Sequence, residues 1–243
     1  MSNKQFGFTR GRSTIDAGVE LVQHIFGAWE DSRDAIRIFC DLSKAFDCVH
    51  HETRIGKLRH YGVTDRALDL LKSYLSNRVQ RVDVNGKKSS GSIVHMSVPQ
   101  GSILGPFLFL VYINDLPSLV KDAHEIVLFA DDTSLLFKVK RQQPTYDNVD
   151  NAISKIEKWF IANNLLLNKM KTKCIRFSLP NVRHGSGSFS VRNKELEFVN
   201  STVFLGITFD NRLQWGPHIT TGALDGASAH CPRIPAGLVN ITY

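Results

Sequence analysis

Long apolar runs are missing from this 243-residue chain. The longest, Ile103–Ile113, is about half of what a membrane span requires, and the polar N-terminus lacks the apolar core of a signal peptide. The four cysteines, at positions 40, 48, 174 and 231, form no Cys-x-x-Cys pair and no disulfide framework. We therefore expect reduced thiols in an intracellular protein without a membrane partner, in either the nucleus or the cytoplasm.

The composition is that of a basic globular protein. The chain has 30 Lys and Arg against 23 Asp and Glu, for a net charge of +7, and 42% of its residues are hydrophobic. A chain of this length buries roughly 70–75% of its unfolded surface, enough for one sizeable core. The positive balance fits a polyanionic partner, although charge alone does not identify one.

Two adjacent carboxylates, Asp131 and Asp132, stand between the run 126–130, of apolar or small residues, and the run Thr133-Ser134-Leu135-Leu136-Phe137, which becomes apolar at Leu135. This pattern predicts a β-hairpin with both carboxylates at its tip. Two like charges about 4 Å apart repel by about 4 kcal/mol at an effective dielectric constant of about 20, and a divalent cation would turn this repulsion into attraction. The structural alternative is ordinary turn chemistry, since aspartate favours turns.

A second carboxylate ends a second predicted strand. Residues 35–40 alternate and are rich in β-branched side chains, Asp41 follows them, and Ser43 is placed to cap a helix after it. If the strands pair, Asp41 converges with Asp131 and Asp132. Three oxygen ligands with room for substrate phosphates suit Mg²⁺, and two such ions can activate an attacking hydroxyl and stabilise a leaving pyrophosphate.

Periodicity predicts the remaining elements. Apolar residues at helical spacing indicate helices over residues 14–29, 52–61, 64–75, 105–114 and 146–160. In the first of these, the apolar stripe is Ile15, Val19, Val22, Ile25 and Phe26. Strand patterns, with an Asn85-Gly86 turn, occupy residues 79–84, 92–98, 174–177, 189–192, 196–199 and 203–209. Mixed strands with helices packed on one side indicate an α+β fold.

Six motifs, in the family's order, resemble those of reverse transcriptases, above all the non-LTR (LINE-like) retrotransposon group with its jockey-type elements. The motifs are Gln5-Phe6-Gly7-Phe8 with Gly11-Arg12-Ser13-Thr14, Asp41-Leu42-Ser43-Lys44-Ala45-Phe46-Asp47, Pro99-Gln100-Gly101-Ser102-Ile103-Leu104-Gly105-Pro106, Phe129-Ala130-Asp131-Asp132, Asn168-Lys169-Met170-Lys171-Thr172-Lys173 and Phe204-Leu205-Gly206-Ile207. The resemblance extends from residue 5 to about residue 215.

The resemblance implies a polymerase palm, an antiparallel sheet backed by helices, with partial fingers. The expected reverse transcriptase domain covers residues 1–209, with fingers at 1–34 and about 50–94 and palm at about 35–49 and 95–209. Residues 210–243 would hold a missing or vestigial thumb and an unrelated or disordered tail. Upstream finger motifs and basic thumb helices are not found, so we expect a domain truncated at both ends.

The implied activity is RNA-directed DNA polymerisation, in which dNTPs are added to a DNA primer 3′ end on an RNA template with two Mg²⁺ ions, for which Mn²⁺ can substitute. Asp41, Asp131 and Asp132 match the catalytic, metal-binding carboxylates of the family. Lys171 matches a lysine suggested to protonate the leaving pyrophosphate; a solvated charged loop is the equal alternative. The oligomeric state is left open.

Other matched positions imply substrate contacts. Leu42, Phe46, Gln100 and Gly101 match the nucleotide-binding positions, and Phe204-Leu205-Gly206 matches the primer grip. Phe46 would exclude a 2′ hydroxyl by leaving it neither room nor a polar partner. The plainer interpretations are core packing for Phe46, a strand-to-helix turn at Gln100-Gly101, and a buried strand at Phe204.

Three hypotheses are alternatives to the RNA-directed DNA polymerase. The first is a catalytically inactive, truncated remnant that at most binds nucleic acid through charge. The second is a viral-type RNA-dependent RNA polymerase, which would carry a polar residue at Phe46 and glycine at Ala130. The third is a group II intron maturase, whose motifs fit less well around Asp131 and Phe204.

Overall fold

A four-stranded antiparallel sheet forms the centre of the protein. The computed structural model describes residues 1–97, 101–120, 125–141, 147–179, 189–191, 194–196, 198–214 and 240–242. The sheet has the order β6 (Glu125–Phe129), β7 (Asp132–Lys140), β1 (Arg33–Cys40) and β9 (Lys173–Phe177). Seven of the eight residues of β1 are buried, so this strand needs cover on both faces.

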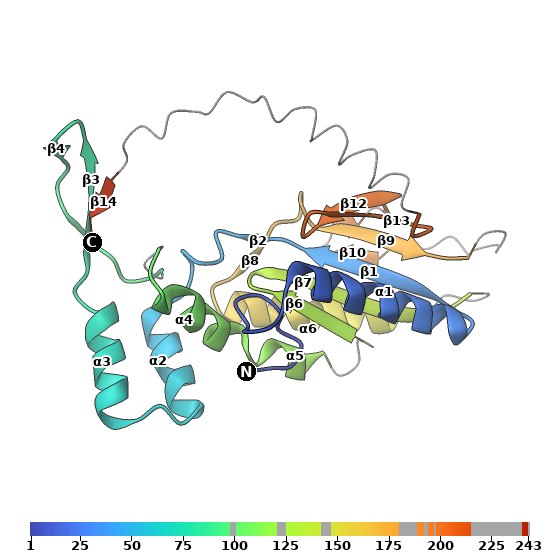
Figure 1. Cartoon of the computed structure of the whole chain (residues 1–243), viewed down its shortest axis with the longest axis horizontal. Helices are drawn as coiled ribbons and strands as arrows, with labels where there is room; N and C mark the ends of the chain where they lie inside the picture. Colours follow the sequence, from blue (N-terminus) through green and yellow to red (C-terminus); the bar gives the residue numbers. More distant parts are fainter. Residues whose placement is uncertain are drawn as a thin grey trace.

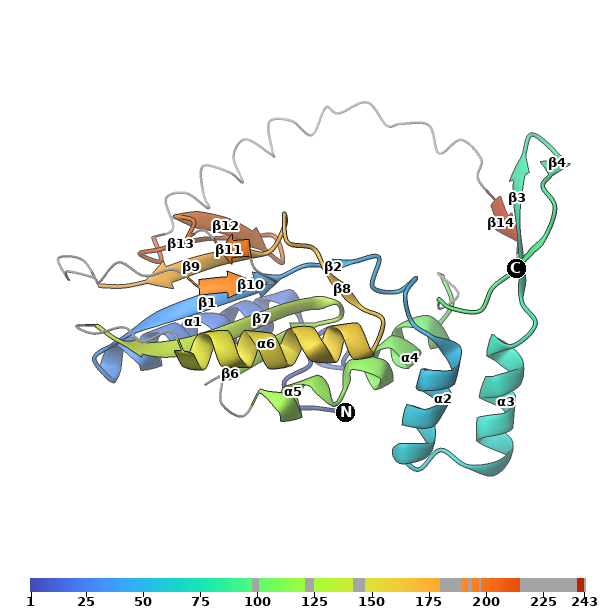
Figure 2. The same ribbon diagram turned by 180° about the vertical axis from the view of Figure 1, so that it is seen from behind.

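Helices provide that cover on both faces, not on one face as the sequence predicted (Figures 1 and 2). α1 (Thr14–Glu30) packs on the face that holds Phe39, Val127 and Ile175. The opposite face, which holds Ile38 and Leu135, is covered by α6 (Asp147–Ala162), α4 (Leu104–Ile113) and α5 (Leu116–Leu119). The central strands alternate between two cores, and each core requires its own helical layer.

α1 begins with a capping box in which Ser13 and Asp16 bond reciprocally. Its buried side is Ala17, Leu21, Ile25 and Ala28. The predicted stripe is therefore wrong at most of its positions, since Ile15, Val19 and Phe26 are exposed. Gly18, on the same buried side, has no room for a side chain, since an added Cβ would lie 2.6 Å from Ile207 Cδ1.

The segment that the sequence assigned to the fingers holds a helix pair and a ribbon of short strands (Figure 1). α2 (His51–His60) and α3 (Asp65–Leu75) share a small core with α4. β3 (Val79–Val84) turns at Asn85-Gly86, which both have positive φ, confirming the hairpin. Its partners are shorter than predicted and comprise β4 (Lys87–Lys88), β5 (Ser92–Ile93) and, from the expected tail, β14 (Asn240–Thr242).

Two local predictions are wrong. Ser43 caps no helix, because β2 (Leu42–Ser43) stays extended and pairs with β8 (Leu166–Leu167). The expected strand 203–209 is a hairpin of β12 (Ser201–Phe204) and β13 (Ile207–Asp210). Its turn residues, Leu205 and Gly206, have φ values of 53° and 77°, a left-handed conformation that reverses the chain.

The remaining described strands, β10 (Phe189–Val191) and β11 (Lys194–Leu196), form a separate antiparallel pair. Within the described ranges, no helix combines the length and the apolar character needed to cross a membrane. Cys40, Cys48 and Cys174 are free thiols, as predicted, and Cys231 lies outside the described residues.

Candidate active site

Asp131 and Asp132 lie at the turn between β6 and β7, as the sequence predicted. Phe129 pairs with Asp132 across this hairpin, so Ala130 and Asp131 form the tip. Ala130 has a φ of 55°, in the left-handed region. Because the turn is tight, with one residue in this conformation, both carboxylates lie immediately at the end of the sheet.

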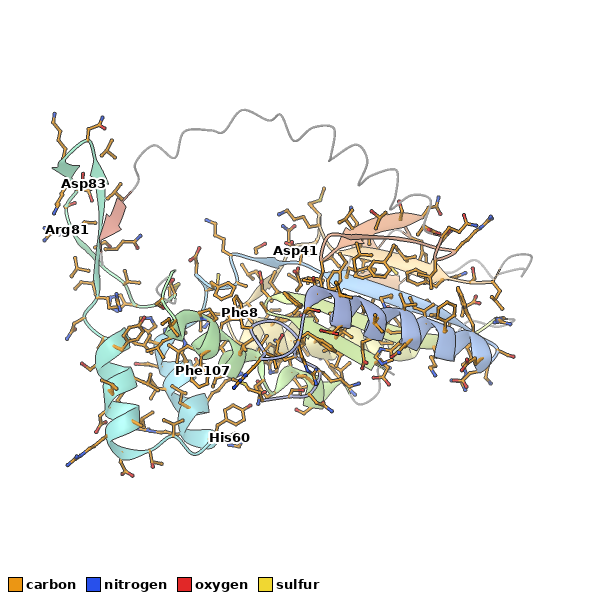
Figure 3. The ribbon with its side chains drawn as sticks, viewed as in Figure 1. Phe8, Asp41, His60, Arg81, Asp83 and Phe107 are labelled. Carbon is orange, nitrogen blue, oxygen red and sulfur yellow. The ribbon has the colours of Figure 1, made fainter. Side chains whose placement is uncertain are left out.

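Asp41 reaches the same edge from β1. Cys40 pairs with Thr133 in the register of β1 with β7, which places Asp41 one residue beyond this pair on one strand and Asp132 one residue before it on the other. In an antiparallel ladder these two positions face each other. Figure 3 shows Asp41 where the sheet gives way to the segment bearing α2 and α3.

The electrostatics agree with this placement. Burial raises the pKa of Asp131, and the nearby Asp41 carboxylate raises it further. Burial, followed by repulsion from Asp131 and then Asp41, raises the pKa of Asp132 to about 6. Asp131 and Asp132 therefore lie close enough to Asp41 for its charge to oppose their ionisation, a repulsion that a bound cation would relieve.

The donor set suits a divalent cation that takes further ligands from outside the protein. All three side chains offer hard oxygen ligands, but within the part of the chain that the structure describes no group of three or more His, Cys, Asp or Glu is gathered closely enough to hold a metal by itself. Mg²⁺ usually binds one or two carboxylates and takes its other ligands from water and phosphates. An open arrangement of carboxylates is consistent with this habit.

A turn after β8 lies against Asp41. Asn168 N donates a hydrogen bond to Asp41 O (2.8 Å), and Asp41 N donates to Thr172 Oγ1 (3.4 Å). Lys171 is exposed in this turn, with its main-chain N–H donating to Asn168 O (3.2 Å). The structure thus brings Lys171 into the loop that contacts Asp41, and its role as a proton donor stays a prediction.

Leu42 and Phe46, two predicted nucleotide-binding residues, follow Asp41 in the sequence. The Phe46 ring is half-buried and stacks on Phe109 of α4, with centroids 4.3 Å apart and an angle of 27°. Core packing and an exposed gate edge are therefore both compatible with its position. The Leu42 side chain is buried, which leaves its main chain as the part available to a nucleotide.

The structure gives less information on the other two predicted substrate sites, Gln100-Gly101 and Phe204-Leu205-Gly206. Gly101 is exposed and has a φ of 79°, just before α4, while Gln100 lies outside the described residues. In the predicted primer grip, Phe204 is buried, and the turn at Leu205 and Gly206 stands beyond it. The structure supports the hairpin, and its contact with a primer stays a prediction.

The sequence pointed to Gln5 and Gly7 as part of a motif without assigning them a task. The structure places both beside the Asp131–Asp132 turn: Gln5 Oε1 accepts a hydrogen bond from Ala130 N (3.0 Å), and a Cβ on Gly7 would lie 2.3 Å from the same nitrogen. The sequence feature that could have indicated this role is a glutamine and a glycine two residues apart in the short segment Gln5-Phe6-Gly7-Phe8.

An apolar hollow lies between the N-terminal segment and α4, apart from the carboxylates. Figure 3 shows Phe8 and Phe107 on its two sides, and both rings are exposed. Its volume is about 450 Å³, and its lining is Met1, Phe8, Thr9, Arg10, Ile103, Pro106, Phe107 and Leu110.

Comparison with solved structures gives the fold. A telomerase from Candida albicans, solved with a TWJ fragment of telomeric RNA, matches with a TM-score of 0.57 at 14% identity, covering 85% of this chain and 34% of that one. An apo telomerase from Candida tropicalis, truncated from its C-terminal domain, matches with a TM-score of 0.55 at 12% identity, covering 85% and 39%. At such identity the likeness shows a shared polymerase palm-type fold.

Comparison with sequences gives the family. The family described as reverse transcriptase (RNA-dependent DNA polymerase) matches residues 1–209. The RNA-directed DNA polymerase assigned to transposon BS of Drosophila melanogaster is 31% identical over 231 residues, 90% of this chain and 25% of that protein. The polymerase from mobile element jockey of the same organism is 29% identical over 222 residues, 89% and 24%. The chain thus spans about a quarter of these relatives' length, and it belongs to the reverse transcriptase family, with jockey-like non-LTR retrotransposon polymerases as its relatives.

Proposed function

We propose that this domain is an RNA-directed DNA polymerase that adds dNTPs to the 3′ end of a DNA primer on an RNA template. The observation that carries the proposal is the meeting of Asp41, Asp131 and Asp132 at one sheet edge, with the pKa of Asp132 raised to about 6 by burial and by its carboxylate neighbours. Membership of the reverse transcriptase family supports the same reaction.

Asp41, Asp131 and Asp132 would hold two divalent cations, Mg²⁺ in preference, with Mn²⁺ as a substitute. Bound cations supply Lewis-acid activation of the primer hydroxyl and neutralise charge on the triphosphate. The residues of the chain position the reactants: Phe46 lies under the sugar, Gln100, Gly101 and the main chain of Leu42 contact the nucleotide, and Phe204-Leu205-Gly206 holds the primer. Lys171 delivers a proton to the leaving pyrophosphate.

The direct test is incorporation of labelled dTTP on poly(rA)/oligo(dT) with Mg²⁺ or Mn²⁺, in the wild type and in Asp131→Asn. We expect metal-dependent synthesis that the substitution abolishes while the circular dichroism spectrum is kept, because the removed charge lies in a turn and not in the core. Asp69→Asn, on exposed α3, is the matched control and should retain synthesis. Activity of Asp131→Asn within a few fold of the wild type would refute the assignment.

A second outcome separates the polymerase from the remnant. A folded wild type that makes no product with either metal would favour an inactive domain that retains nucleic-acid binding. That binding would weaken steeply between 50 and 200 mM salt, as expected when it depends on phosphate neutralisation by Lys and Arg.

A further inference from the structure

A short N-terminal segment lies along the free edge of β6, the strand that leads into the Asp131–Asp132 turn. Phe6 N donates a hydrogen bond to Leu128 O (2.8 Å), and Leu128 N donates to Lys4 O (2.9 Å). Gln5, between these two residues, forms a parallel bridge with Leu128. The segment therefore acts as a one-residue extension of the central sheet.

The Gln5 side chain reaches from this segment into the turn. The residue is only 3% exposed, and its Oε1 accepts hydrogen bonds from Gly7 N (2.8 Å) and Ala130 N (3.0 Å). Both partners are N–H donors, so the oxygen of the amide must face them. Within the described structure its Nε2 is buried without a hydrogen-bond partner. The amide orientation therefore satisfies the oxygen with two hydrogen bonds and leaves the nitrogen unsatisfied.

Ala130, the donor of one of these two hydrogen bonds, has an unfavourable backbone conformation. Its φ of 55° is in the left-handed region, where a side chain with a Cβ is disfavoured. Gly7 packs directly on the same peptide, since an added Cβ there would lie 2.8 Å from Phe129 C and 2.3 Å from Ala130 N. The turn is thus held from one side by main-chain contact and by the Gln5 amide.

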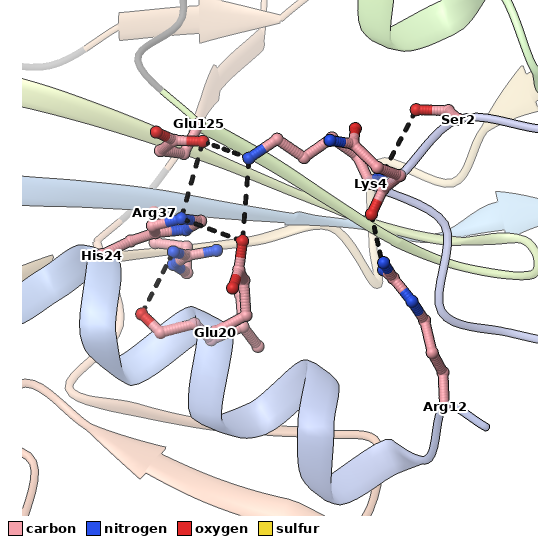
Figure 4. Close-up of polar contacts among 9 residues, drawn as sticks. Ser2, Lys4, Arg12, Glu20, His24, Arg37 and Glu125 are labelled. Atoms are coloured by element: carbon pink, nitrogen blue, oxygen red, sulfur yellow. Dashed lines mark hydrogen bonds and ion pairs between the residues drawn. The ribbon is translucent and has the colours of Figure 1, made fainter.

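Independent contacts hold the segment in place around Gln5. Lys4 Nζ pairs with Glu125 (2.7 Å) and Glu20 (3.7 Å), and His24 lies within 3.5 Å of both carboxylates (Figure 4). The Arg12 guanidinium stacks 4.5 Å from the centre of the Phe6 ring. Loss of the Gln5 amide alone should therefore leave the segment docked.

We infer that Gln5 is a positioning residue for the catalytic carboxylates: its amide oxygen holds the Ala130 peptide in the left-handed turn and thereby sets where Asp131 and Asp132 project. Gln5 itself touches no reacting atom. The kinetic consequence of this inference rests on the proposed polymerase function, whereas the hydrogen bond to Ala130 does not.

Amide hydrogen exchange tests the hydrogen bond without any need for activity. We compare the wild type with Gln5→Met, which keeps the length of the side chain but has no acceptor of comparable strength, and with Gln5→Glu, which keeps two acceptor oxygens. In Gln5→Met the protection of the Ala130 amide should fall about 10-fold, the size expected for one lost hydrogen bond. The Leu128 amide, bonded to Lys4, should keep its protection, and Gln5→Glu should restore that of Ala130.

Gln23→Met, at an exposed glutamine on α1, controls for the substitution and should change neither amide. Two results overturn the inference: unchanged protection of Ala130 in Gln5→Met, or equal loss at Ala130 and Leu128, which would show that Gln5 merely keeps the segment packed.

A kinetic measurement separates positioning from folding. Misplaced carboxylates bind metal less well, so Gln5→Met should raise the Mg²⁺ concentration for half-maximal synthesis several-fold. A loss of folded protein would lower the maximal rate and leave that concentration unchanged, a result that would contradict a positioning role. If the wild type makes no product, the proposed function fails, and the amide experiment still decides how Gln5 acts on the turn.

Discussion

The rings of Phe39 and Phe204 pack with their centroids 4.9 Å apart, and this contact attaches the β12–β13 hairpin to β1, the strand just before Asp41. The ring of Phe209, on the second strand of the hairpin, also packs on Phe39, with the two centroids 5.9 Å apart. The predicted primer grip and the strand before Asp41, a predicted catalytic carboxylate, are thus tied to one buried cluster.

Phe204→Ala should lower the free energy of unfolding by about 3–5 kcal/mol, because it removes a buried ring and leaves a cavity under the hairpin. Urea denaturation followed by circular dichroism measures the change. Val203→Ala, at an exposed position on the same strand, should stay within about 0.5 kcal/mol of the wild type. Similar losses in both variants would show that the Phe39 contact is not what secures the hairpin.

Asp132→Asn should stabilise the metal-free protein at pH 7.5. The raised pKa of Asp132, about 6 against an ordinary 3.8, means that the folded state holds this proton more tightly than the unfolded chain does. The free energy of unfolding of the wild type therefore falls as the pH rises from about 4 to 6. Asparagine does not ionise, so the Asp132→Asn variant does not lose this stability. At pH 4 the two proteins should be nearly equal in stability.

Thermal melts at pH 4 and pH 7.5 without metal measure this effect, with exposed Asp69→Asn as the control. Mg²⁺ should reduce the difference in melting temperature between Asp132→Asn and the wild type at pH 7.5, because a cation stabilises the ionised wild-type site. A wild type that is more stable than Asp132→Asn at pH 7.5 in EDTA would contradict the raised pKa.

Phe46→Val should increase the use of ribonucleotides relative to deoxynucleotides, because a smaller side chain leaves room for a 2′ hydroxyl. Competition between UTP and dTTP on poly(rA)/oligo(dT) measures this ratio. Phe109→Leu disturbs the same ring stack from the α4 side and should lower stability without changing the ratio. If both variants shift it equally, Phe46 acts through packing and not as a gate.

Gly7→Ala should disrupt the turn at Ala130, since the new methyl group would lie 2.3 Å from Ala130 N and main chain would have to move. We expect a loss of thermal stability together with a loss of synthesis. The same substitution at Gly56, which has open space around it in α2, should raise stability by up to about 1 kcal/mol, because alanine favours the helix. Equal stability of the two variants would argue against close contact at Gly7.

The elements that depend on local pattern were predictable from the sequence. The strand before Asp41, the Asp131–Asp132 hairpin and the Asn85-Gly86 turn all appear, because each is specified by neighbouring residues: alternating apolar side chains, or a pair that tolerates positive φ. The five predicted helices begin and end within a few residues of their predicted limits, whereas the short α5 was not predicted and the helix expected after Asp41 does not form.

The failures share a different cause. The side of α1 that is buried, the extended state of Leu42 and Ser43, and the reversal at Leu205-Gly206 each depend on a partner distant in sequence: the central sheet, β8, and the Phe39 cluster. α1 carries apolar residues on more than one side, so periodicity does not select the face that meets the sheet.

The sequence by itself determined the family of this protein and its candidate carboxylates, because the motifs and the strand-end positions are a matter of residue type and order. Tertiary structure alone decided how the site is held, because the register of Cys40 with Thr133 and the hydrogen bond from Ala130 N to Gln5 Oε1 join segments roughly 90 and 125 residues apart. Such contacts form when packing brings distant segments together, and no local pattern encodes them.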